Sequence, residues 1–293
     1  MIDLHTHSTA SDGTFSPAEL VRAAGQLNLE ALALTDHDTV AGITEFLTAG
    51  ATSTVQTIPG VELSCSWYGG TMHILGLFID PENPGLIRLL EKVQITRRER
   101  NRIILEKLRE NGIPITLEQV EAETGSVNLG RPHIGVCLTR QGVCTDLRDA
   151  FRRFLGRNQL AYVRRFLPLP DEVIDVIHQA GGIAIWAHPL NKLRHSTAKL
   201  RQVARFLQEK GLDGMEVLYP DFSEREVATA QKVAHELHLL PSGGTDFHGA
   251  NTPDLALAVG RGQLQVPADL LSAMMFRARE WTEKQQVPEP LPE

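Results

Sequence analysis

The sequence predicts an α/β protein with a parallel sheet and a helical insertion in its middle. Short apolar segments alternate with amphipathic segments in both halves of the 293-residue chain. Such alternation is typical of strand–helix units whose strands form a parallel sheet, either open or closed into a barrel. From about residue 96 to 165 the alternation stops, and helical patterns alone remain. We therefore expect an α/β domain over residues 1–95 and 166–293, with a helical cap over residues 96–165.

In the first half, each element has its own local signal. Residues 2–7 are expected to form a short strand. Ser16 and Glu19 have the spacing of a capping box, so a helix is expected to begin there and to continue to about Leu27. The continuous apolar run over 31–35 indicates a strand that is buried on both faces. A helix over 40–49 follows, and then strands over 56–64 and 73–79.

The second half repeats the alternation. It predicts strands over 182–187, 214–218, 239–243 and 255–259, and helices over 171–179, 199–209, 224–237 and 268–277. The insertion has helical patterns over 97–109, 117–123, 132–141 and 147–154. We find no convincing strand pattern there, so the insertion is expected to be helical.

Composition and charge exclude several classes of protein. Apolar residues make up 42% of the chain and charged residues 22%, an ordinary globular balance. No apolar run reaches the roughly 18 residues of a membrane helix, and the first residues do not form a secretory signal. Three cysteines without a Cys-x-x-Cys pair suit a reducing cytoplasm. The net charge of −7 argues against duplex DNA as a partner. We expect a cytoplasmic protein without membrane attachment.

The insertion differs in charge from the rest of the chain. Residues 131–165 contain eight arginines and two aspartates, a local charge of +6, so the remaining residues sum to −13. One interpretation is a solvated basic surface. The other is a set of guanidinium groups that bind an anionic substrate beside a site in the α/β domain.

Imidazole and carboxylate side chains collect at the predicted strand ends. His5 and His7 are two residues apart on a strand, so both rings point to one face and can share a metal ion. The other strands deliver similar groups near their carboxyl ends, where sites gather in parallel α/β folds. Taken singly, residues 36–38 could cap a helix, Glu62 could be an ordinary strand-end carboxylate, and His73 could be a core histidine. Together, nine groups are too many for one ion and enough for two or three: His5, His7, Asp12, His37, Glu62, His73, His133, Asp246 and His248.

These segments give the chain a resemblance to the PHP (polymerase and histidinol phosphatase) family. The resemblance rests on DLHTHS (3–8), DG (12–13), TDHD (35–38), PGVE (59–62), HILG (73–76), AHP (187–189) and TDFH (245–248). It runs in order over almost the whole chain. The chain is most similar to the branch that contains the 3′,5′-nucleoside bisphosphate phosphatases and ribonuclease AM. That branch also has a helical insertion, an arginine-rich helix start like RRER (97–100), and an insertion histidine like His133.

The resemblance implies a distorted (β/α)₇ barrel with a site for three metal ions. Carried over by position, the first ion would bind His5, His7, Glu62 and Asp246. The second would bind Asp12, His37 and His248. The third would bind Glu62, His73 and His133, with Glu62 as a bridge. Family members commonly use Mn²⁺, and Zn²⁺ or Fe²⁺ also occur, so we expect two or three such ions in each chain.

The implied activity is the hydrolysis of phosphate esters. Substrates would be nucleoside 3′,5′-bisphosphates, with pAp converted to AMP, and the 5′ ends of short RNA, trimmed one nucleotide at a time. Clustered dications lower the pKa of a bridging water, which then attacks phosphorus as hydroxide. Asp36 or Asp38 is expected to orient His37. His188 is expected to bind phosphate or to protonate the leaving oxygen.

Basic side chains are candidates for binding the substrate phosphates. Arg97, Arg98, Arg100 and Arg131 would bind a second phosphate. Relatives often carry an arginine shortly after the His-Pro pair, whereas this chain has Lys192 and Arg194 nearby. One of these two would have to replace that arginine, although a lysine cannot reproduce a bidentate guanidinium contact.

Two other functions stay open. The first is a histidinol-phosphate phosphatase, which the basic insertion makes less attractive. The second is a PHP domain that binds metal or a partner without catalysis. An inert domain would be expected to have lost some ligands, and all nine positions are filled here. No protein partner is predicted, and the expected partners are a small nucleotide or a short RNA 5′ end.

Overall fold

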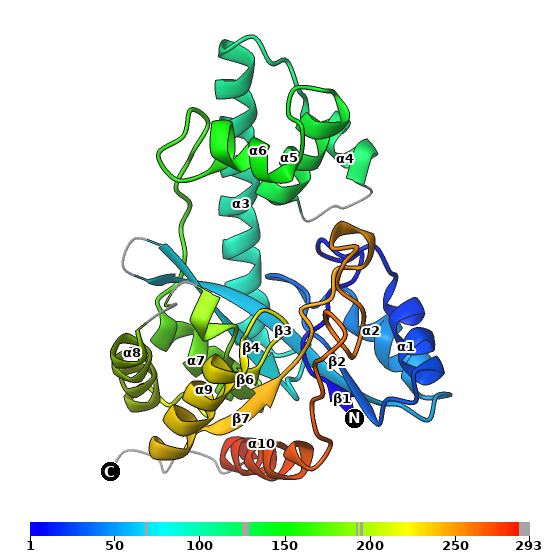
Figure 1. Ribbon diagram of the computed structural model, residues 1–293, viewed down its shortest axis with the longest axis vertical. Coiled ribbons are helices and arrows are strands. Elements are labelled where there is room, and N and C mark those ends of the chain that lie inside the picture. The colour runs from blue at the N-terminus through cyan, green and yellow to red at the C-terminus, as the bar shows by residue number, and fades with distance from the viewer. Residues whose placement is uncertain (68–69, 125–128, 192, 194–195, 287–293) are drawn as a thin grey trace.

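The computed structural model describes residues 1–67, 70–124, 129–191, 193 and 196–286. Seven strands form one mixed sheet in chain order and curve into a nearly closed barrel (Figure 1). The backbone amide of Leu4 donates to the carbonyl of Gly243 at 3.3 Å, and Thr6 bridges to Phe247, so the first and last strands approach each other. The strands are β1 (Ile2–Asp3), β2 (Ala31–Leu34), β3 (Gln56–Trp67), β4 (Gly70–Leu77), β5 (Ile183–Trp186), β6 (Gly214–Leu218) and β7 (Leu240–Gly243). The predicted α/β barrel is confirmed.

The expectation of an all-parallel sheet is wrong at β4. β3 and β4 form a long antiparallel pair, and β4 is also antiparallel to β5, while the other neighbours are parallel. Both strands extend beyond their predicted ranges, and the connection left between them is far shorter than the dozen or more residues of a parallel crossover. Because β4 runs backwards, its first half lies beside the last half of β3. His73 therefore pairs with Ser64 and reaches the same barrel end as the carboxyl ends of the parallel strands.

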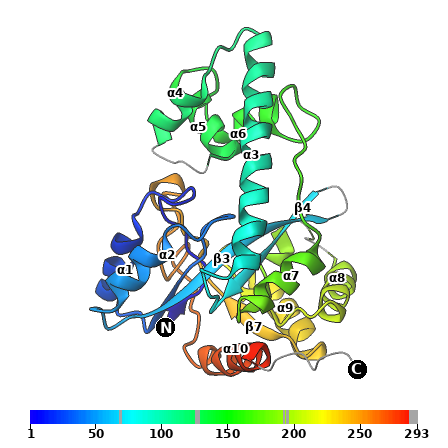
Figure 2. The same ribbon diagram turned by 180° about the vertical axis from the view of Figure 1, so that it is seen from behind.

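Helices surround the barrel and close one of its ends. The capping box predicted at Ser16 is present, with Ser16 and Glu19 bonding reciprocally at the start of α1. The last helix lies across the end of the barrel away from the insertion (Figures 1 and 2). Its Leu271 and Met274 join Ile2 and Ile185 in the core inside the barrel. The barrel helices are α1 (Pro17–Gln26), α2 (Ile43–Gly50), α7 (Pro170–Gln179), α8 (Thr197–Glu209), α9 (Glu224–Glu236) and α10 (Leu270–Gln286).

The strand predicted over 255–259 is wrong. These residues form turns, with one isolated bridge between Ala256 and Gly260. Leu255 and Leu257 are buried against α1 and α2, so their hydrophobicity reflects packing of a loop on helices and not a place in the sheet.

The insertion rises from the barrel on one long helix, α3 (Pro84–Glu110) (Figure 1). Leu86 and Leu90 near its start pack in the apolar cluster between the barrel wall and its helices, whereas Ile104 and Leu108 pack in a separate insertion core. The helix therefore runs through the predicted boundary at residue 96, and the division into domains stays a prediction. The other insertion elements are α4 (Leu117–Thr124), α5 (Arg131–Arg140), α6 (Leu147–Ala150) and a π-helical turn over Phe151–Leu155.

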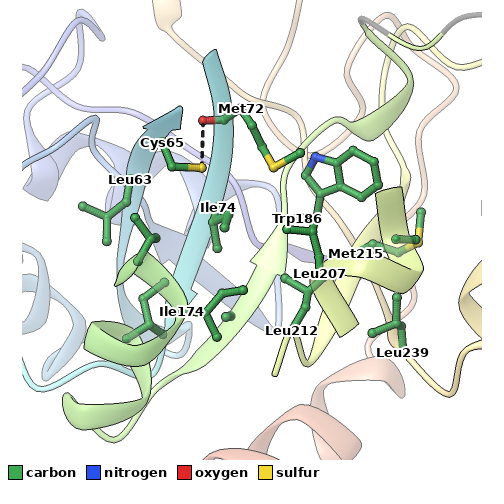
Figure 3. Close-up of a cluster of buried hydrophobic side chains, with 14 of the residues drawn as sticks. Leu63, Cys65, Met72, Ile74, Ile174, Trp186, Leu207, Leu212, Met215 and Leu239 are labelled. Carbon is green, nitrogen blue, oxygen red and sulfur yellow. Dashed lines mark hydrogen bonds between the residues drawn. The ribbon is translucent and has the colours of Figure 1, made fainter. Parts of the chain in front are cut away.

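The largest apolar cluster lies outside the barrel wall. Figure 3 shows Leu63 and Ile74 of β3 and β4 beside Ile174 of α7, with Trp186 and Leu207 farther along. These side chains are apolar on the face that the helices cover, which is why β3 to β6 are buried on both sides. Within the described residues, no helix has the length and hydrophobicity needed to cross a bilayer.

The carboxylate of Asp3 connects the two edges of the barrel. It accepts hydrogen bonds from the amide of Thr245 at 2.9 Å, from the Thr245 hydroxyl at 2.6 Å and from the amide of Ala258 at 3.0 Å. Asp3 is fully buried, so each of these donors would lack a partner without it.

Replacing Asp3 with alanine should therefore lower the free energy of unfolding by about 3 kcal/mol, because several buried donors lose their acceptor. Urea unfolding of the metal-free protein measures this change. Asp80→Ala is the matched control, since Asp80 is exposed and caps a local turn. An Asp3→Ala protein as stable as this control would contradict the role of Asp3 in closing the barrel.

Candidate metal centre

Histidines and carboxylates converge at the barrel end below the insertion. His5 and His7 follow β1, His37 follows β2, and Asp246 and His248 follow β7. Three groups of side chains each bring one possible ligand atom per residue within 4.8 Å of the others. They are His5, His7, Glu62 and Asp246; His7, Asp12, His37 and His248; and His37, Glu62 and His73.

Glu62 lies at the centre of this arrangement. It belongs to two of the groups, and its side chain is fully buried. Its oxygens lie 2.8 Å from Nδ1 of His37 and 2.8 Å from Nδ1 of His73. The backbones of Glu62, on β3, and His37 form an isolated parallel β-bridge, which fixes the spacing of the two residues.

The donor set fits divalent metal ions. Buried nitrogens of His5 and His7, and one buried oxygen each of Asp12, Glu62 and Asp246, have no hydrogen-bond partner within the part of the chain that the structure describes. Buried polar atoms normally have partners, because desolvation without one costs free energy. Imidazole and carboxylate donors that converge in this way suit Zn²⁺, Fe²⁺ or Mn²⁺.

The local charges also favour bound cations. Burial raises the pKa of Asp12, Glu62 and Asp246, but the surrounding imidazoles outweigh burial and hold each pKa well below its usual range. Burial lowers the pKa of His37 and His248, and the neighbouring carboxylates raise the two values to about 9 and about 10. These histidines would therefore exchange protons for metal ions on loading.

The three groups of possible metal ligands are called the metal groups below. A second set of predicted residues lines a cavity of about 470 Å³ beside them. Asp12, His37 and His73 form its inner wall. The predicted Arg97, Arg100 and Arg131 line it, together with Arg164 and Arg165, which the sequence analysis missed. Arg98, in contrast, is exposed and does not line this cavity. Lys192 and Arg194 lie outside the described residues.

Comparisons with known proteins match this geometry. The model of the PHP domain matches residues 3–116. A 5′-3′ exoribonuclease of Haemophilus influenzae is 38% identical over 84% of this chain and 89% of its own length. The chain belongs to the PHP domain family. A 3′,5′-nucleoside bisphosphate phosphatase of Chromobacterium violaceum is 33% identical over 84% of this chain and 87% of its own.

A solved structure is similar to this chain over almost its whole length. A protein assigned as a metal-dependent phosphoesterase from Bifidobacterium adolescentis superposes with a TM-score of 0.83 at 28% identity. The match covers 94% of this chain and 96% of that one. The fold is thus that of metal-dependent phosphoesterases, and its candidate metal site is the His/Asp/Glu cluster described above.

In this PHP domain, Asp36 and Asp38 hold the loops on either side of His37. Asp36 accepts from the amide of Ser8 at 2.7 Å and from the Ser8 hydroxyl at 2.6 Å, which fixes the loop that leads to Asp12. Asp38 accepts from the amide of Ser64 at 2.8 Å and pairs with Arg97 and Arg165. Their predicted role in orienting the His37 ring stays a prediction.

Two predicted histidines lie at the edge of the PHP metal groups. The Nε2 of His188 is 3.1 Å from Oε1 of Glu62, so His188 is within reach of the centre. His133 does not join the three groups. Its Nδ1 accepts from the amide of Gly130 at 2.8 Å, and its ring also bonds to the backbone of Ser11. His133 thus connects the insertion to the loop of Asp12, and its role as a ligand stays a prediction.

Glu216 and Tyr219 support the ligands and were missed in the sequence. Glu216 is fully buried, its Oε1 lies 3.0 Å from Nδ1 of His5, and its Oε2 accepts from the amide of His188 at 2.5 Å. The Tyr219 hydroxyl donates to Oδ2 of Asp246 at 2.8 Å. Glu216 fixes the Nδ1–H tautomer of His5 and leaves Nε2 for a metal ion. The sequence signal that could have identified Glu216 was its place near the end of the strand predicted over 214–218.

Replacing Glu216 with glutamine should weaken Mn²⁺ binding about tenfold, because the charged acceptor that orients His5 is lost. Calorimetric titration of the metal-free protein measures the affinity, and circular dichroism checks the fold. Glu236→Gln is the control, since Glu236 is an α9 surface residue paired with Arg201. Equal Mn²⁺ affinity of Glu216→Gln and this control would exclude the supporting role.

Proposed function

We propose that this chain hydrolyses the phosphate ester at the 3′ oxygen of a nucleoside that also carries a 5′-phosphate. Nucleoside 3′,5′-bisphosphates and the 5′ ends of short RNA both contain this unit. The bisphosphate loses its 3′-phosphate, so pAp becomes AMP, and the RNA loses its first nucleotide. The observation that carries this proposal is the arginine-lined cavity next to the metal groups. The names of the two curated relatives describe these two activities.

The cavity is built to hold an anion. Asp38 pairs with two of its guanidinium groups, those of Arg97 and Arg165. Nε of Arg97 and Nη1 of Arg165 are buried and have no hydrogen-bond partner among the described residues. Burial, together with neighbouring guanidinium groups, lowers the pKa of Arg100 to about 8. A phosphate would supply the missing acceptors and the missing negative charge.

The position of this cavity favours a substrate with two phosphates. His37 and His73 face it, so a phosphate among the arginines would lie close to an ester at the metal groups. In both substrates the bond between phosphorus and the 3′ oxygen breaks, water supplies hydroxide to phosphorus, and a proton goes to the 3′ oxygen. His188 is our candidate donor of that proton. Bound dications would activate the water and neutralise the phosphoryl oxygens.

We further propose Mn²⁺ as the working metal, with two or three ions in each chain and Zn²⁺ or Fe²⁺ as substitutes. The mixed imidazole and carboxylate donors suit each of these three ions. We also propose a cytoplasmic location. It is supported by Cys65, Cys137 and Cys144, which are buried and free of disulfides.

In the direct experiment, Mn²⁺-loaded protein is incubated with adenosine 3′,5′-bisphosphate and, separately, with a 5′-phosphorylated RNA trimer. Chromatography should detect AMP and phosphate from the first substrate and mononucleotides from the second, and a chelator should abolish both. Turnover of histidinol phosphate alone would overturn the proposal in favour of the other phosphatase. Metal binding without turnover of any substrate would favour a non-catalytic domain.

Replacing Arg131 with alanine should raise the KM for adenosine 3′,5′-bisphosphate about tenfold, because a charge-assisted contact to the 5′-phosphate is lost. The KM for adenosine 3′-monophosphate, which lacks that phosphate, should change less than about twofold. Steady-state kinetics with both substrates measure this difference. Arg98→Ala is the matched control, because Arg98 is exposed outside the cavity. Equal effects of Arg131→Ala on both substrates would contradict the assignment.

A further inference from the structure

A second cavity, of about 730 Å³, opens on another side of the metal groups. It lies between α5 and α6 of the insertion and the loops that follow β1, β6 and β7. Asp12, Asp246 and His248 form its inner wall. Its size is in the range of small-molecule sites, so it can hold a nucleotide-sized group.

The metal groups therefore separate two cavities. Asp12 and Pro132 line both, whereas His37 and His73 face the arginine-lined cavity alone. Asp246 and His248 face the second cavity alone. A phosphodiester at the metal groups can thus extend in two directions, with one ester oxygen toward each cavity.

The walls of the second cavity differ chemically from those of the first. Val136, Leu147 and Leu255 give it an apolar part. Its two arginines are already paired, Arg140 with Glu123 at 3.0 Å and Arg261 with Asp221 at 3.0 Å. These walls suit a neutral sugar and base and not a buried phosphate, which would need unpaired cations.

We propose that the second cavity binds the nucleoside on the 3′ side of the scissile phosphate of an RNA substrate. The inference rests on the proposed function, in which the 5′ nucleotide occupies the arginine-lined cavity. A nucleoside bisphosphate ends at the scissile phosphate and leaves the second cavity unused. An RNA continues beyond that phosphate. The second cavity adjoins the metal groups on the side opposite the first nucleotide of the RNA, so it can receive the next nucleoside.

The test fills the second cavity without touching the metal groups. Ala250 lines this cavity and is exposed, and its side chain is a single methyl group, so a substitution there removes little. In Ala250→Trp, kcat/KM for the 5′-phosphorylated RNA dinucleotide pApA should fall about tenfold or more, since the indole occupies the place of the second nucleoside. For adenosine 3′,5′-bisphosphate it should stay within about twofold of wild type, which also shows that the variant is folded. Val136→Trp, from the insertion side, should give the same pattern.

The matched control is Ala228→Trp, which places the same side chain at an exposed position on α9 and should change neither substrate. Equal losses on pApA and the bisphosphate, or no loss on pApA, would overturn the inference. Wild-type enzyme that hydrolyses the bisphosphate but not pApA would overturn it as well, and would leave the bisphosphatase function intact. Wild-type enzyme that hydrolyses neither substrate would instead contradict the proposed function.

Discussion

Burial of the Glu62 carboxylate is the constraint on which the rest of the structure depends. The side chain is wholly inaccessible to solvent, and five imidazoles of the described residues lie within 3.4 Å of its oxygens. A buried carboxylate costs several kcal/mol unless positive charge compensates it. Bound divalent ions would supply that charge and would leave the imidazoles neutral to act as ligands. The convergence of β1, β2 and β7, and the reversed direction of β4, bring candidate ligands to this one carboxylate.

The insertion gives the two cavities beside the candidate metal centre chemically different walls. Toward α3 it contributes several guanidinium groups, of which those of Arg97 and Arg165 share the carboxylate of Asp38. Toward α5 and α6 it contributes apolar side chains and arginines that are already paired. The candidate metal centre thus has surroundings that suit a charged 5′ end on one side and a neutral nucleoside on the other. In the proposed function, this division lets a single site act on both a bisphosphate and an RNA chain.

Much of the barrel, and the convergence of its histidines and carboxylates, could be predicted because both depend on local patterns. His5 and His7 share a face by strand geometry, and His37, Asp246 and His248 come shortly after strand segments. The direction of β4 was missed because an apolar pattern shows where a strand lies and not which way it runs. The eight residues between the strands predicted over 56–64 and 73–79 are too few for a parallel crossover, and this spacing was the available signal. Glu216 has no neighbouring pattern, so its contact with His5 emerges only in three dimensions. Arg165 was missed for the same reason, since folding alone brings it to Asp38 beside α3.

The most direct test of the central claim is the metal content of wild type and Glu62→Gln. Both proteins would be loaded with Mn²⁺, passed through gel filtration and measured by mass spectrometry. Because Glu62 belongs to two of the three ligand groups, wild type should retain two or three ions, as its mixed ligand set allows, and Glu62→Gln should retain one or none. A wild-type protein with less than one ion, or a variant with unchanged content, would contradict the account.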